Sequence, residues 1–123
     1  MSYNEQIKTI IDAIRPDFDV LGTFAFQGFG DPMAVTSAFV SVFEAYQKAK
    51  EETAKTFGSE SIEVDDGSML CTPNGGQIEN DDSEMLAVYT IAKEQGFLPP
   101  PMLGLIGDFT MQINRFFMAA QKR

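Results

Sequence analysis

Few side chains of this 123-residue sequence could carry out covalent chemistry, and the most obvious is the only cysteine, Cys71. It lies in the stretch GSMLCTPNGGQIEN, two residues before a Pro-Asn-Gly-Gly turn. A cysteine becomes a good nucleophile when a basic neighbour lowers the pKa of its thiol, but residues 59–84 contain no Lys or Arg. We therefore expect Cys71 to be a small, partly buried side chain on a strand rather than a catalytic group.

The sequence contains no histidine at all. This excludes the Ser-His-Asp and Cys-His arrangements that activate nucleophiles, and it excludes zinc or iron sites built on imidazole. The phosphate-binding G-x-x-x-x-G-K-[ST] motif is absent, and the glycines of GTFAFQGFG at residues 22–30 lack the spacing of a dinucleotide-binding loop. We expect neither enzymatic activity nor a cofactor.

Carboxylates are the other candidates for chemistry, and they are concentrated in one segment. The chain has a net charge of −9, and eight of its 18 acidic residues lie in residues 59–84. The segment lacks the calcium-binding loop with Asp or Asn at its first, third and fifth positions, so we expect no metal. Direct nucleic-acid binding normally needs a basic face, so we expect none either. The segment instead predicts an acidic surface, made by Glu63, Asp65, Asp66, Glu79, Asp81 and Asp82.

The elements that would position these groups begin at the N-terminus. A capping box at Ser2 and Glu5, four isoleucines at helical spacing and then Pro16 predict a first helix over 3–15. Residues 17–30 alternate apolar residues with others, which favours a strand or an extended connector.

Three further helices are predicted from the residues at their ends. An Asp-Pro start and a glycine stop predict the longest helix, over 32–57. Acidic residues before another apolar stripe, and a glycine after it, predict a helix over 83–95. Three consecutive prolines lead into a last helix over 102–121.

Two hairpin signals, Asp66-Gly67 and Asn74-Gly75, lie between the second and third helices. They predict a small antiparallel three-stranded meander over 60–80. The expected fold is therefore a single α+β domain, predominantly helical, with four helices and a β-meander between helices two and three. A single cysteine, no signal-peptide pattern and no apolar run long enough to span a bilayer lead us to expect a soluble cytoplasmic protein.

The last predicted helix has more apolar surface than one buried face needs. Apolar residues repeat at 4-3-4-3 spacing, and further Leu, Met and Phe residues lie off this seam. Burial inside the domain and an interface with a second copy or a protein partner both fit this pattern. Asp108, Gln112 and Arg115 form a narrow polar stripe that we expect to face solvent. The candidate interface consists of Met102, Ile106, Phe109, Ile113, Phe116 and Phe117.

The sequence leaves three functional hypotheses. The first is a non-catalytic association protein that forms a homo-oligomer or docks a protein partner through its last helix. The second is an acidic decoy, of the kind that virus-encoded antagonists use, which presents the carboxylates of residues 60–84 to a basic protein surface. The third is a small-ligand-binding protein with a pocket lined by Phe24, Phe26, Phe29 and the methionines of the last helix.

Overall fold

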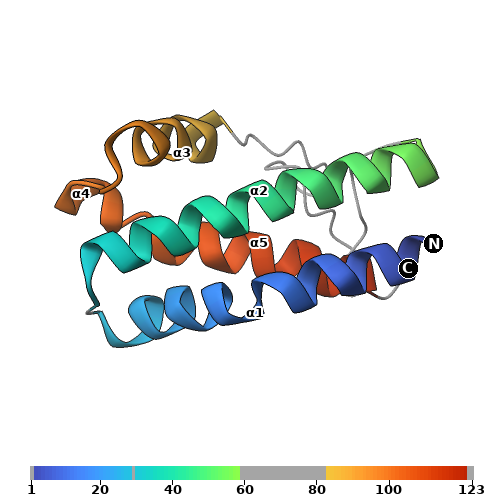
Figure 1. Ribbon diagram of the computed structural model, residues 1–123, viewed down its shortest axis with the longest axis horizontal. Coiled ribbons are helices and arrows are strands. Elements are labelled where there is room, and N and C mark those ends of the chain that lie inside the picture. Colours follow the sequence, from blue (N-terminus) through green and yellow to red (C-terminus); the bar gives the residue numbers. More distant parts are fainter. Residues whose placement is uncertain (1, 29, 59–82, 122–123) are drawn as a thin grey trace.

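A computed structural model describes residues 2–28, 30–58 and 83–121 of the chain (Figure 1). The regular elements of these residues are helices: α1 (Tyr3–Gln27), α2 (Pro32–Phe57), α3 (Ser83–Gln95), α4 (Pro100–Leu103) and α5 (Ile106–Gln121).

The expected α+β class is wrong, because the part of the chain that the structure describes is helical and contains no strand. The meander predicted over 60–80 lies outside the described residues. The segment 17–30 was the other candidate strand, and it is helical up to Gln27.

Helix α1 continues through Pro16, where the sequence predicts its end. Proline removes one intrahelical hydrogen bond, but this ring is exposed, so the loss falls on the solvent side of the helix. The buried face of α1 continues past the proline, because Leu21 lies two turns after Ile14 and is fully buried. Gly28 ends the helix in the left-handed conformation, with φ of 76°.

The predictions over 32–57 and 83–95 are confirmed as α2 and α3. At the start of α2, the Asp31 side chain accepts a hydrogen bond from the backbone N–H of Met33, at 3.3 Å. At its end, Gly58 takes the left-handed conformation that the sequence assigns to it. These two ends were predictable because capping depends only on adjacent residues.

The last predicted helix, 102–121, is divided into α4 and α5. The single turn of α4 starts on the prolines, and the backbone N–H of Gly104 bonds the carbonyl of Pro100 at 3.2 Å. The long helix restarts at Ile106. Three adjacent prolines fix the chain direction at this point, so helical spacing alone does not locate the first residue of α5.

Helices α1, α2 and α5 run side by side along the length of the molecule, and α3 lies beside the first half of α2 (Figure 1). Aromatic rings join α2 to α5 in the core. The ring centroids of Phe39 and Phe109 are 5.8 Å apart, and those of Tyr46 and Phe116 are 5.2 Å apart. On the other side of α2, Tyr89 of α3 packs on Phe43 with centroids 4.8 Å apart. None of the helices in the described ranges is long and apolar enough to cross a membrane.

Candidate functional site: the groove between α1 and α5

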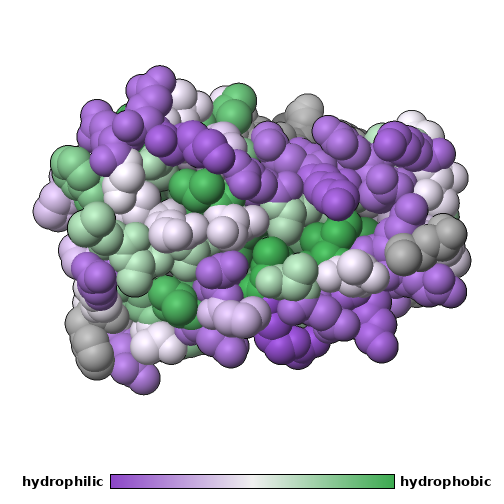
Figure 2. All heavy atoms as spheres, in the orientation of Figure 1, coloured by the Kyte–Doolittle hydropathy of each residue, from purple (hydrophilic) through white to green (hydrophobic). Residues whose placement is uncertain are grey.

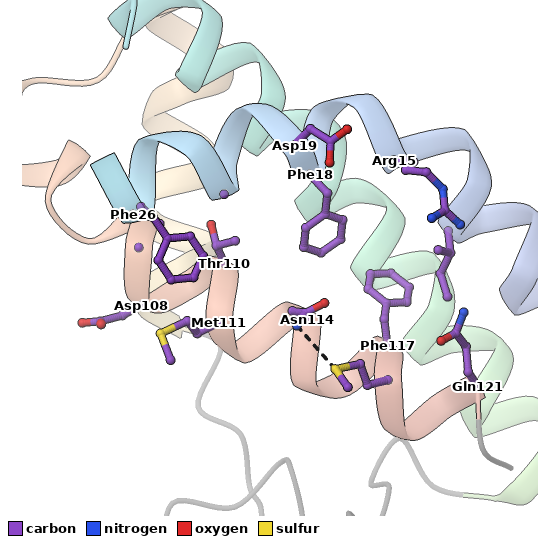
Figure 3. A pocket seen from close by; sticks show the side chains of 15 residues that line it. Arg15, Phe18, Asp19, Phe26, Asp108, Thr110, Met111, Asn114, Phe117 and Gln121 are labelled. Carbon is purple, nitrogen blue, oxygen red and sulfur yellow. Dashed lines mark hydrogen bonds between the residues drawn. The ribbon is translucent and has the colours of Figure 1, made fainter. Parts of the chain in front are cut away.

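A groove of about 490 Å³ lies between α1 and α5, with Phe18 and Phe117 among the residues that line it (Figure 3). Each helix lines it with a row of residues, and Asp19, Phe26, Asp108, Thr110 and Phe117 lie beside these rows. From α1 come residues 11, 15, 18, 22 and 25, and from α5 come residues 107, 111, 114, 118 and 121. Each set follows 4-3-4-3 spacing, which keeps a row of side chains on one helix face.

The floor of the groove is apolar, and small residues make it hollow. Phe18 and Phe117 meet edge to face across it, with ring centroids 6.0 Å apart. A Cβ added to Gly107 would lie 3.8 Å from the Cβ of Ala25, so the two helices approach closely there. A Cβ added to Gly22 would meet nothing within 4 Å, because it would point into the open groove. A larger side chain at residue 22 would therefore fill the groove without a clash.

Large apolar side chains stand exposed along the groove. Phe26 is 89% exposed, Met111 is 61% exposed and Met118 is 51% exposed. The Asn114 amide donates a hydrogen bond to the Met118 sulfur at 3.5 Å, which orients this methionine along the helix. On the face of the molecule shown in Figure 2, hydrophobic side chains form small patches separated by hydrophilic ones. The groove differs from such scattered positions because its exposed apolar groups share one cavity.

The charges around the groove are unequally paired. The Arg15 guanidinium donates to the Asp12 carboxylate at 3.0 Å, so this positive charge has a local counter-ion. Asp19 and Asp108 also line the groove, and neither forms an ion pair with any described residue. Figure 3 shows Asp108 at the opposite end of the groove from Arg15. The two unpaired carboxylates give the groove an acidic character.

The predicted interface residues belong mainly to the core of the chain itself. Met102 is half-buried and packs against the core. The other five residues are at most 4% exposed: Ile106, Phe109, Ile113, Phe116 and Phe117. The structure therefore places the predicted seam inside the protein, while the surplus apolar surface of this helix is formed by Met111 and Met118.

The predicted ligand pocket is partly brought together. Phe26 lies in the groove with Met111 and Met118, as the hypothesis of a Phe/Met-lined pocket requires. Phe24 does not line the groove, and its ring lies 3.5 Å from a Cβ built on Gly30, in the connection between α1 and α2. Phe29 lies outside the described residues.

The acidic-surface residues lie outside the described residues: Glu63, Asp65, Asp66, Glu79, Asp81 and Asp82. The decoy hypothesis therefore stays a prediction. Cys71 also lies outside the described residues. The polar stripe of Asp108, Gln112 and Arg115 is exposed, as predicted.

A second polar cluster joins α3 to α2. The Tyr89 hydroxyl and the Lys93 ammonium both donate to one Glu44 carboxylate oxygen, at 2.5 Å and 2.8 Å. The hydrogen bonds from Lys93 and then from Tyr89 hold the pKa of the Glu44 carboxyl below its ordinary value, since they stabilise its charged form. The cluster is exposed and lines none of the described cavities, so its geometry supports docking of α3 rather than ligand binding.

Sequence reasoning missed the groove, although the signal was present. The 4-3-4-3 rows of α1 and α5 can be read from the sequence only if α1 is taken to continue beyond Pro16.

Among the described residues, no group of three or more His, Cys, Asp or Glu side chains could hold a metal ion. No family model, no curated protein and no solved structure matches this chain.

Proposed function

We propose that the protein is a non-catalytic association protein that docks a polypeptide in the groove between α1 and α5. The observation that carries this proposal is the row of exposed apolar side chains, Phe26, Met111 and Met118, around one cavity of about 490 Å³. Apolar surface of this kind is unfavourably exposed to water, so the free energy falls when a partner covers it.

The groove takes the role that the sequence assigned to the apolar face of the last helix. That face is already buried against α1 and α2, so it is not available to a partner. The absence of histidine from the whole sequence supports a non-catalytic role, because it removes the usual proton shuttle at neutral pH. The cytoplasmic location expected from the single cysteine is part of this proposal.

Site-specific photo-crosslinking tests the proposal, with matched positions inside and outside the groove. Benzoylphenylalanine is placed either at Met111, which is 61% exposed in the groove, or at Met33, which is 65% exposed at the start of α2. We expect irradiation of cells that contain the full-length chain to give a discrete polypeptide adduct, a second copy or another protein, from residue 111 alone. Equal adducts from both positions, or no adduct from residue 111, would contradict the proposal.

A further inference from the structure

The shape of the groove favours a helix as the bound segment. Its two rows of side chains each cover about 14 residues, or roughly 21 Å at 1.5 Å per residue. The cavity volume is spread along this length between two antiparallel helices, which suits an elongated group. Two facing rows with 4-3-4-3 spacing also provide the regular holes into which the side chains of a third helix fit. A third helix of about four turns would cover Phe26, Met111 and Met118 together.

The charges that line the groove favour a basic helix as the bound segment. Asp19 and Asp108 line the groove without an ion pair among the described residues, while Arg15 is paired with Asp12 at 3.0 Å. An ammonium or guanidinium group beside the apolar ridge of a bound helix would reach these two carboxylates. An acidic helix would meet like charges at both positions.

The total charge disfavours a second copy as the occupant. Each chain carries a net charge of −9, so two copies repel one another at long range, whereas a basic partner is attracted. Docking of the groove against the same groove also brings four carboxylates, Asp19 and Asp108 from each copy, into one interface with only two guanidinium groups, those of Arg15, which are already paired with Asp12.

We infer that the groove binds an amphipathic helix of another protein, with apolar residues at i, i+3 or i+4 and i+7 and with Lys or Arg beside this ridge. This inference rests on the proposed function, and it adds the chemistry of the partner. Gly22, where an added Cβ would meet nothing within 4 Å, leaves space for the apolar ridge, and Asp19 and Asp108 supply the countercharges.

The test uses methyl-labelled methionine in the full-length chain and two designed peptides of about 16 residues, which share one leucine ridge and differ in carrying lysine or glutamate beside it. We expect the lysine peptide to shift the methyl resonances of Met111 and Met118 but not that of Met33. The glutamate peptide is expected to bind at least about tenfold more weakly. Absence of a shift with the lysine peptide, or equal binding of both peptides, would overturn the inference.

Three variants separate groove binding from general attraction to an acidic protein. Asp19→Asn with Asp108→Asn should weaken the lysine peptide about tenfold. Glu51→Gln with Glu94→Gln is the control, since it removes the same charge at exposed positions outside the groove, and it should change binding less than about twofold. Gly22→Leu should abolish binding by filling the groove. Equal weakening by both charge variants, or binding that survives Gly22→Leu in a chain that still unfolds cooperatively, would overturn the inference.

The same spectra distinguish this inference from the function on which it rests. Shifts of Met111 and Met118 that grow with protein concentration in the absence of peptide would identify a second copy as the occupant. That result would overturn the basic-helix inference and leave association through the groove standing. If the methyl resonances shift neither with protein concentration nor with either peptide, and residue 111 gives no crosslink, both the proposed function and the basic-helix inference are contradicted.

Discussion

At the scale of single residues, the Glu44 carboxylate is the described group with the clearest electrostatic role. It accepts hydrogen bonds from Lys93 and Tyr89, which lie one turn apart on α3, so it fixes one face of that helix against α2. Its pKa is lowered below the ordinary 4.5, first by the bond from Lys93 and then by the bond from Tyr89. The hydrogen bond to Glu44 is also the main cause that raises the pKa of Tyr89 and that of Lys93.

The sign of the resulting pH dependence follows from these directions. A carboxyl whose pKa is lowered in the folded state stabilises that state fully above pH 4.5, and the contribution is lost as the pH falls through the lowered pKa. The raised pKa values of Tyr89 and Lys93 have the opposite sense, so their contribution is full below pH 10 and is lost at higher pH. The effect is small because the cluster is exposed and screened by solvent.

We predict that Glu44→Gln lowers the free energy of unfolding at pH 7 by a small amount and that the difference from wild type is smaller at pH 3, on the acid side of the ordinary pKa of 4.5. Urea unfolding at the two pH values measures this. In the variant, the pKa of Tyr89, followed by NMR of its ring carbons, should fall toward 10.0 because the charged acceptor is gone. Glu94→Gln, at an exposed position without an ion pair among the described residues, serves as the control. If Glu44→Gln leaves the pKa of Tyr89 unchanged, the Glu44 carboxylate is not what raises it.

At the scale of elements, α1 shows why local signals predict some helix ends and miss others. The ends of α2 are set by Asp31 and Gly58, whose effects depend on adjacent backbone groups, so the sequence predicts them. Pro16 is also a local signal, but here burial decides the outcome. Residues Ile14 and Leu21 both pack into the core, and this packing keeps one helix continuous across the missing hydrogen bond.

We predict that Pro16→Ala stabilises the protein. Alanine restores the backbone N–H that can bond the carbonyl four residues earlier, and little packing would be lost because the proline is exposed. The free energy of unfolding should rise by about 1–3 kcal/mol, as measured by urea denaturation. Gly22→Ala provides a comparison in the same helix, since its new Cβ meets nothing within 4 Å, and it should add up to about 1 kcal/mol. A loss of stability in Pro16→Ala would instead mean that the proline sets the path of α1 along α5.

At the scale of the whole molecule, the faces of α5 could be predicted from the sequence, but their roles could not. The 4-3-4-3 seam through Ile106, Phe109 and Ile113 was recognisable as one apolar face. Whether that face packs on α1 and α2 or on another chain depends on contacts between residues far apart in the sequence, which periodicity does not encode. The groove depends on the same pairing, because it exists only where α1 lies beside α5.

Two substitutions on α5 measure how the molecule divides its apolar residues between core and groove. Ile113 is fully buried, whereas Met111, two positions earlier, is 61% exposed. Ile113→Ala removes buried methyl groups and leaves a cavity, so we expect it to lower the free energy of unfolding by about 2–5 kcal/mol. Met111→Ala should change it by less than about 0.5 kcal/mol in the isolated chain and should weaken partner binding. Urea denaturation of both variants at two protein concentrations is the measurement. A large cost for Met111→Ala that grows with protein concentration would mean that a second copy already covers the groove, because only then would this methionine be buried in the folded state.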